Sequence, residues 1–209
     1  MCIRDRPGGM GAASFVRYCQ GMGVEITEEQ AKDLKKSYME KWPEMAEYFK
    51  YCSGLMQGAD TAKVTFVRSG LVRDAVFYCA VCNGFFQHLA AMGAKNATYN
   101  VVKECFTGDS ALFGCRPVLF LHDEIGIEIP DDSKKQERVD RLQKVMIESM
   151  NVWIPDVPIT CEAVLMRKWY KGAEPVYRDG IIVPSMPKKE GKKTIWVPDL
   201  VDKDLKDAI

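Results

Sequence analysis

Residues 117–130 constrain the fold of this chain more than any other stretch. A run of apolar residues leads directly into His122-Asp123-Glu124, and an alternation of isoleucines with Gly126 and Glu128 follows. A continuous apolar run predicts a buried strand and an alternating run predicts a half-buried one, so we expect a hairpin with polar groups at its tip. Such groups are costly to bury unless something pairs with them. Magnesium ions and a phosphate chain would do so.

The composition is that of an ordinary globular protein and leaves the class of partner open. The 209 residues are 47% hydrophobic and 28% charged, enough for one large core or for two subdomains. Lys+Arg and Asp+Glu each number 29, so any basic surface that attracts nucleic acid would have to be a local patch. No run is long enough to span a bilayer and the first residues lack a signal-peptide centre, so we expect no membrane partner and a cytoplasmic location.

The cysteines favour a structural role. There are eight of them, and Cys79 and Cys82 form the only C-x-x-C spacing. No second pair lies at zinc-finger spacing, and the chain has only two histidines to add to a soft-metal site. Reduced thiols that serve as small core residues are therefore a better interpretation than a metal or redox site.

The first six residues are expected to be foreign to the gene. Met1-Cys2-Ile3-Arg4-Asp5-Arg6 back-translates to ATGTGTATAAGAGACAG plus one base, which resembles the transposon-end adapter used in sequencing libraries. We therefore exclude residues 1–6 from the fold prediction and expect the natural gene to continue upstream of Pro7. The chain is accordingly expected to be a fragment of a longer protein.

The first third of the chain predicts helices followed by a strand. A short helix is expected over 12–21, and the capping box Thr27-Glu28-Glu29-Gln30 starts a second helix that Pro43 ends. A third helix is expected over 44–57, stopping at Gly58. Residues 62–67 predict a strand and 68–71 its turn.

Residues 73–106 predict one long helix that is apolar nearly all round and therefore buried. The exceptions are Asn83 and Gln87, which share one face at i and i+4, with Arg73 near the start. Amide donors can contact the minor-groove acceptors that every base pair shows, whatever the sequence. The alternative is that both amides cap loops or bind buried water.

The rest of the chain predicts a loop over 107–114, the hairpin, one more helix and a third strand. The motif Ser133-Lys134-Lys135-Gln136 is a second capping box, and the helix after it carries apolar residues on its inner face. A strand over 159–165 is expected to flank the hairpin. From Gly172 onward we expect an extended tail, whose basic segment 188–193 either touches a phosphate backbone or is a solvated terminus.

The hairpin tip suits phosphoryl or nucleotidyl transfer. That chemistry requires carboxylates holding two magnesium ions, which activate the attacking oxygen and stabilise the leaving one. Asp123 is a plausible magnesium ligand, whereas Glu124 points to the opposite side of the strand unless the turn rotates it. His122 could donate a hydrogen bond to a phosphate or a sugar. Taken alone, the tripeptide could also be a chance feature of a hairpin.

Four stretches, taken in order, resemble the C-terminal part of a family A DNA polymerase of the phage-type branch. Residues 7–45 resemble the fingers segment that follows the nucleotide-binding helix. Residues 69–95 resemble the helix that contacts template and primer in the minor groove. The motif Leu121-His122-Asp123-Glu124 resembles the second catalytic motif of the palm, and residues 155–158 and 168–173 resemble the closing segment. The match covers roughly residues 7–175, and the joint order is far more specific than any single piece.

The resemblance implies an α+β fold in which a helix-rich fingers portion packs on a small antiparallel palm sheet. It implies partial fingers over 7–72, the DNA-contacting helix and palm over 73–172, and a C-terminal tail over 173–209. The implied partners are primer-template DNA and deoxynucleoside triphosphates, with Mg²⁺ as cofactor, in the cytoplasm of a bacterium or of a phage-infected host.

The resemblance also implies roles for single residues. Asp123 would ligate the catalytic magnesium, Glu124 would support it, and His122 would lie near the primer terminus. Asn83 and Gln87 would contact the duplex, with Arg73 close to them.

The sequence departs from the family pattern in two respects. His88 stands where the family usually has a glycine, and the family's first catalytic aspartate and nucleotide-binding helix do not occur in this chain. We therefore expect the isolated chain to lack polymerase activity that its parent would have. Two alternatives stay open: a non-catalytic module that binds duplex DNA, and a plain structural α+β protein.

Overall fold

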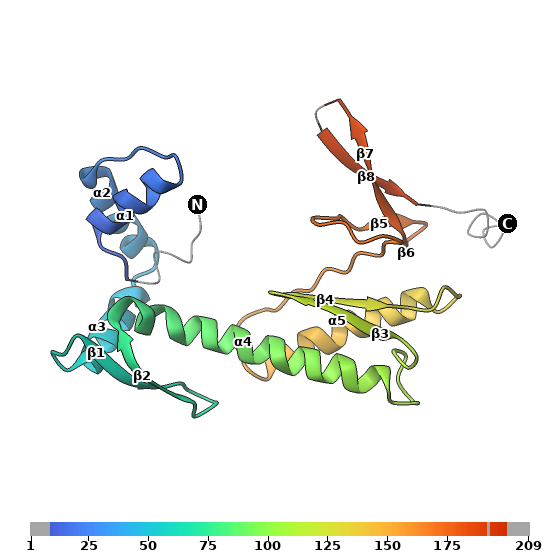
Figure 1. Cartoon of the computed structure of the whole chain (residues 1–209), viewed down its shortest axis with the longest axis horizontal. Helices are drawn as coiled ribbons and strands as arrows, with labels where there is room; N and C mark the ends of the chain where they lie inside the picture. The colour runs from blue at the N-terminus through green and yellow to red at the C-terminus, as the bar shows by residue number, and fades with distance from the viewer. Residues whose placement is uncertain (1–8, 192, 200–209) are drawn as a thin grey trace. The chain divides into compact units, whose positions relative to one another are not determined.

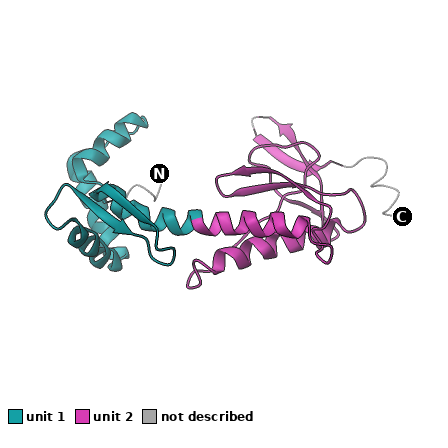
Figure 2. Cartoon of the chain, turned by 60° about the horizontal axis from the view of Figure 1, so that its bottom comes forward, with its two compact units in different colours: residues 1–91 teal, residues 92–209 magenta. Residues whose placement is uncertain are grey.

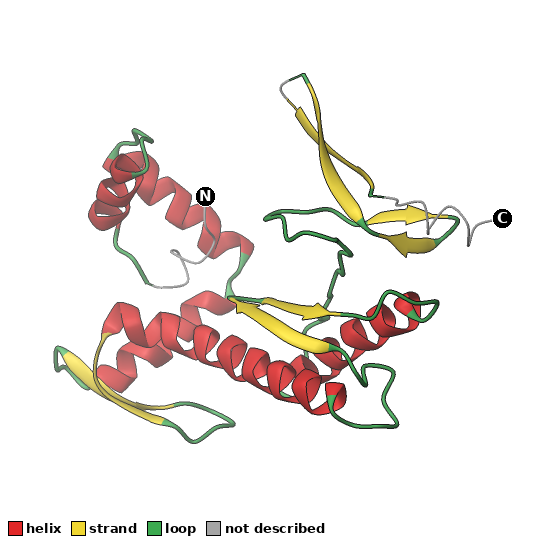
Figure 3. Cartoon of the chain, turned by 45° about the vertical axis from the view of Figure 1, so that its right-hand side comes forward, coloured by secondary structure: helices red, strands yellow, loops and turns green. Residues whose placement is uncertain are grey.

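The computed structural model describes residues 9–191 and 193–199 and has a mixed α+β architecture. The described residues form five helices and four antiparallel sheets of two strands each (Figure 1, Figure 3). The chain divides into two compact units, residues 1–91 and 92–209, and the boundary falls within the longest helix (Figure 2). None of the helices described here is long and apolar enough to cross a membrane.

The first unit begins with three helices whose ends follow the expected signals. They are α1 (Ala12–Gly21), α2 (Glu28–Lys41) and α3 (Glu44–Met56). The capping box is confirmed: the Thr27 hydroxyl accepts from the Gln30 amide at 3.1 Å, and the Gln30 side chain accepts from the Thr27 amide at 2.9 Å. Such a cap satisfies two amides that the first helical turn leaves unpaired. Gln57, in the left-handed region with φ 49°, and Gly58 end α3.

The long helix starts later than the periodicity predicts. Residues 72–77 form the strand β2 (Val72–Phe77), which pairs with β1 (Thr61–Thr65), and α4 (Tyr78–Cys105) follows without a break. The expected helix start at Arg73 is therefore wrong. Pairing with β1 satisfies the backbone groups of this segment, and Val76 becomes buried against the core. Arg73 is exposed on β2 and does not lie on the helix that carries Asn83.

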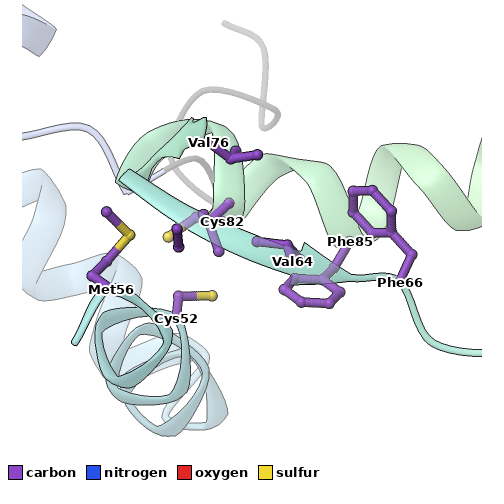
Figure 4. Packing of buried hydrophobic residues seen from close by; sticks show 9 residues of the cluster. Cys52, Met56, Val64, Phe66, Val76, Cys82 and Phe85 are labelled. Atoms are coloured by element: carbon purple, nitrogen blue, oxygen red, sulfur yellow. The ribbon is translucent and has the colours of Figure 1, made fainter. Parts of the chain in front are cut away.

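A compact core joins α3, the β1–β2 hairpin and the start of α4. It contains sulfur and aromatic side chains that face one another (Figure 4). Phe85 lies against Tyr51 and Phe66, with ring centroids 5.8 Å and 5.7 Å away. The expectation that cysteines serve as core residues is confirmed for five of them, which are buried: Cys19, Cys52, Cys82, Cys105 and Cys115.

The expectation that α4 is buried all round is wrong for the described residues. Val81 and Val101 are almost fully buried, whereas Phe86 is 45% exposed and Tyr99 65% exposed. One stripe of the helix packs in each unit, and the remaining apolar side chains face away from that packing. Apolar composition alone therefore overstates how much of a helix its own chain covers.

The second unit contains the expected hairpin, formed by β3 (Arg116–Leu121) and β4 (Glu124–Glu128). Isoleucines 125, 127 and 129 pack on a cluster made by α4 and α5 (Lys135–Asn151). The expectation that β3 is buried is wrong, because Val118 is 60% exposed and Phe120 49% exposed. Only one face of the hairpin is covered by the described chain.

Three further expectations in the second unit are wrong. Ser133 does not cap α5: the Asp132 carboxylate accepts from the Lys134 amide at 2.9 Å, and the helix starts at Lys135. Residues 159–165 form no strand, and the Gln143 side chain donates to the Cys161 carbonyl at 2.7 Å. The expected tail instead folds into two hairpins over 176–198, while residues 200–209 lie outside the described part. The strands are β5 (Val176–Arg178), β6 (Ile181–Val183), β7 (Ser185–Glu190) and β8 (Lys193–Pro198).

An ion pair between α4 and α5 predicts acid sensitivity of the second unit. Arg141 forms a two-point contact with Glu104, and the Ser110 hydroxyl donates to the same carboxylate at 2.7 Å. The hydrogen bonds from Arg141 are the main cause that lowers the pKa of Glu104 from its ordinary value of 4.5. Because the pKa of Glu104 is lower in the folded state, its ionised carboxylate stabilises the fold at pH values above its ordinary pKa. This stabilisation is lost as the pH falls through the pKa of the folded state.

We therefore expect Glu104→Gln to lower the free energy of unfolding of the second unit at pH 7 by about 1–2 kcal/mol. Below about pH 4.5, the free energy of unfolding of this variant should depend less on pH than that of the unchanged protein. Urea denaturation at a series of pH values measures both effects. Glu148→Gln is the matched control, because Glu148 is 55% exposed and lies 3.7 Å from the same guanidinium. Equal effects of the two substitutions would contradict the assignment.

Candidate functional site

The tip of the β3–β4 hairpin has a tight and strained turn. Leu121 pairs with Glu124, which leaves His122 and Asp123 as a loop of two residues. His122 has φ 55°, and Asp123 is not in the positive-φ region. A positive φ at the first loop position is typical of hairpin turns whose twist matches their strands, and glycine normally occupies it. A histidine there costs about 1–3 kcal/mol, and such strain is concentrated at functional sites.

The turn places two carboxylates side by side in the sequence at an exposed position. Asp123 ends the loop and Glu124 opens β4, and both side chains are exposed. The indole nitrogen of Trp169 donates to one oxygen of Glu124 at 3.3 Å. This contact fixes Glu124 from a segment that follows α5. The Asp123 carboxylate makes no hydrogen bond or ion pair within the described residues, which leaves its oxygens available to an external ligand.

The hairpin fits a magnesium ion that takes most of its ligands from elsewhere. Magnesium is usually held by one or two carboxylates together with waters and substrate phosphates. Asp123 and Glu124 supply oxygen donors of this kind. Among the described residues, no group of three or more His, Cys, Asp or Glu side chains converges to hold a metal. The hairpin tip therefore supplies two exposed carboxylates and, within the described residues, no third ligand beside them.

The two amides predicted to contact DNA lie on the part of α4 that belongs to the first unit. Asn83 is half-buried and Gln87 is exposed, and their spacing of four residues places them on the same helix face. Neither side chain forms a hydrogen bond within the described residues, so loop capping by these amides is not observed there. Their hydrogen-bonding groups are available to water or to a bound partner.

His88 has a structural role that the sequence did not reveal. Its ring stacks on Phe66 at a centroid distance of 4.3 Å, and its Nε2 lies 2.6 Å from the Ser69 hydroxyl. Ser69 in turn accepts from the Leu71 amide at 3.1 Å. His88 thus holds the β1–β2 turn against α4, one residue after Gln87.

The structure groups the predicted residues unevenly. His122, Asp123 and Glu124 come together at the hairpin tip of the second unit, whereas Asn83 and Gln87 share a helix face of the first unit. Arg73 lies on β2, apart from that face. Trp169 was missed as a site residue, although it lies in the basic segment 167–171 and within the stretch 168–173 that resembles the closing segment.

No family model matches this chain. A search of curated proteins also finds no match. The roles of Asn83, Gln87 and the hairpin carboxylates therefore depend on their chemistry and placement and on the resemblance of the motifs that carry them.

A groove of the second unit lies between α4 and α5, and its lining includes no residue of the hairpin tip. Two of its charged side chains, Glu104 and Arg141, form an ion pair, and Arg141 lies 3.7 Å from Glu148. Lys103 and Asp109 also line the groove. The hairpin tip, with its exposed carboxylates, is the better candidate for chemistry.

Proposed function

We propose that this chain supplies the catalytic magnesium hairpin and the DNA-contacting helix of a family A DNA-directed DNA polymerase. The observation that carries the proposal is the hairpin tip, where a strained loop of two residues presents Asp123 next to Glu124. In this assignment, β3 and β4 are the catalytic hairpin of the palm, α4 is the DNA-contacting helix, and α1, α2 and α3 are part of the fingers. The test is primer extension by the full gene product that contains this chain.

The residues of the tip have distinct roles in the proposed reaction. Bound magnesium would activate the primer hydroxyl and neutralise the leaving pyrophosphate. Asp123 would act as the protein ligand, and Trp169 would hold Glu124 in place beside it. The exposed His122 ring would donate to a phosphate or sugar oxygen at the primer end. A complete two-metal site would need carboxylates in addition to Asp123 and Glu124.

The helix face of Asn83 and Gln87 supports the choice of a duplex as partner. An enzyme that copies any template must hold correctly paired DNA regardless of sequence, and amide donors can reach the acceptors common to all base pairs. The half-buried position of Asn83 restricts its side chain, whereas Gln87 is exposed and can adjust. These properties suit contacts to the minor groove.

We expect the double substitution Asn83→Ala with Gln87→Ala to weaken binding of primer-template DNA about tenfold, independently of DNA sequence. Loss of two hydrogen bonds of about 0.5–1.5 kcal/mol each accounts for this change. Fluorescence anisotropy with two duplexes of unrelated sequence measures it at fixed salt concentration, because affinity for DNA depends steeply on salt.

The matched control is Gln20→Ala, which removes an exposed amide from α1 of the same unit. This variant should bind DNA as the unchanged protein does. Equal affinities of the double variant and the control would remove the assignment of α4 as a DNA-contacting helix.

A second candidate function is duplex binding without catalysis. It keeps the helix face of Asn83 and Gln87 as the contact to DNA. The two candidates differ at Asp123, because a non-catalytic module assigns no metal to this side chain. Calorimetric titration with Mg²⁺ in the presence of primer-template DNA separates them. Binding that Asp123→Ala abolishes favours the polymerase, and the absence of Mg²⁺ binding favours the second candidate.

A further inference from the structure

The start of α4 brings an exposed cysteine next to buried ones. Cys79 and Cys82 lie in the first two turns of the helix, three residues apart. Cys79 is exposed, whereas Cys82 is fully buried. Cys52 of α3 belongs to the same buried cluster as Cys82, and both are shown in Figure 4. An exposed thiol thus lies about one helical turn from a thiol of the core.

The spacing of Cys79 and Cys82 suits a disulfide after a small local movement. Residues three apart in a helix have Cβ atoms about 5–6 Å apart, and a disulfide needs about 3.5–4.5 Å. The first turn of a helix has amides without helical partners, so it can tighten at low cost. Cys105 and Cys115 also lie in one core cluster, but they are only 1% and 2% exposed, so neither offers a thiol to solvent.

The surroundings of Cys82 shield it from direct attack. A Cβ added to Gly9 would lie 3.2 Å from the Cys82 sulfur and 2.9 Å from the Tyr78 ring, so the chain passes directly over both. Burial, the largest cause, raises the pKa of the Cys82 thiol to about 12. Cys82 is therefore expected to stay protonated and not to react directly with a disulfide in solution, which leaves Cys79 as the first thiol to react.

We propose that Cys79 and Cys82 form a thiol–disulfide exchange site that takes low-molecular-weight disulfides such as glutathione disulfide. The Cys79 sulfur attacks one sulfur of the small disulfide, whose S–S bond breaks and releases one thiol molecule. The Cys82 sulfur then attacks the sulfur of Cys79 in the mixed disulfide. A second thiol molecule leaves with the proton of Cys82. The two cysteines are oxidised to a disulfide, and the small disulfide is reduced to two thiols.

This site is independent of the proposed polymerase function, and its test involves no DNA. The full chain is incubated with glutathione disulfide at neutral pH, quenched with acid and digested with trypsin. Cleavage after Arg73 and Lys95 yields one peptide that contains Cys79 and Cys82 and no other cysteine. We expect this peptide to lose the mass of two hydrogen atoms, and dithiothreitol to restore it.

Two variants define the order of the steps. Cys79→Ser changes an exposed side chain and should abolish both the mixed disulfide and the internal one. Cys82→Ser should trap glutathione on Cys79, because the resolving thiol is gone. The buried pair Cys105 and Cys115 should stay reduced under the same conditions and serves as the internal control.

Two outcomes would overturn the proposal. One is a peptide 74–95 that keeps its full mass while glutathione disulfide stays unreduced. The other is oxidation of Cys82 that persists in Cys79→Ser, for example through a disulfide to Cys52, since Cys79 would then not be the entry thiol. Because Cys79 is exposed, its substitution is expected to leave the fold intact, so a failure to react cannot be ascribed to unfolding.

Discussion

Asp123→Ala in the full gene product is expected to abolish primer extension while duplex binding largely persists. Asp123 is exposed and, unlike Glu124, accepts no hydrogen bond within the described residues, so its carboxylate is available to a metal. Loss of a magnesium ligand removes several kcal/mol of transition-state stabilisation, so the rate of extension should fall by a factor of about 10³ at least. Incorporation of a single labelled nucleotide measures the rate, and anisotropy measures DNA binding.

The matched control is Glu128→Ala at the other end of the same hairpin. Glu128 is exposed and pairs with Arg116 in the β3–β4 register, so its removal changes the charge of the hairpin by the same amount. This variant should extend primers as the unchanged protein does. Undiminished primer extension by Asp123→Ala, or an equal loss of extension rate in both variants, would contradict the catalytic assignment of the hairpin tip.

The hairpin could be predicted from the sequence because its signals are local. An apolar run, a polar pair at the turn and an alternating run define two strands, and the register of Leu121 with Glu124 follows from the short loop. The burial of β3 could not be predicted in the same way, since Val118 and Phe120 are exposed in the structure. What covers a face depends on distant parts of a protein, which local patterns do not encode.

The same reasoning explains the error at the start of α4 and the missed hairpins near the C-terminus. Residues 72–77 pair with β1, and this non-local pairing overrides the helical period of the segment. The β5–β6 turn did have a local signal in the sequence, the pair Asp179-Gly180. In the structure both residues have positive φ, at 51° and 80°. An Asp-Gly pair between short β-branched segments is a strong hairpin signal, and the high Pro and Lys content obscured it.

The candidate site was predictable in part. The residues of the tip are consecutive, so a motif could find them. Trp169 contacts Glu124 across 45 positions of sequence, and no periodicity links the two. The strain at His122 is likewise a property of the folded turn. Asn83 and Gln87 could be paired from their spacing of four, because helical geometry alone places them on one face.

Phe85→Ala is expected to have the largest effect on the stability of the first unit, lowering it by about 3–5 kcal/mol. Phe85 is 7% exposed and contacts the rings of Tyr48, Tyr51 and Phe66. Its removal leaves a cavity between α3, the β1–β2 hairpin and α4, and the loss is a large part of the stability of a typical domain. Hydrogen exchange followed by mass spectrometry measures the change separately for residues 1–91 and 92–209.

Phe86→Ala is the matched control, since the neighbouring ring is 45% exposed and contacts only Tyr48, at 4.9 Å, among the ring pairs of the described residues. It should cost about 1 kcal/mol. Equal losses of protection would contradict the packing of α4.

The same two variants test how the core supports the proposed DNA contacts. Asn83 lies two residues before Phe85 in α4. Phe85→Ala should therefore loosen this turn and weaken DNA binding, although the Phe85 ring itself is buried and contacts no partner. Phe86→Ala should retain more of that affinity, because it leaves the core around Asn83 filled.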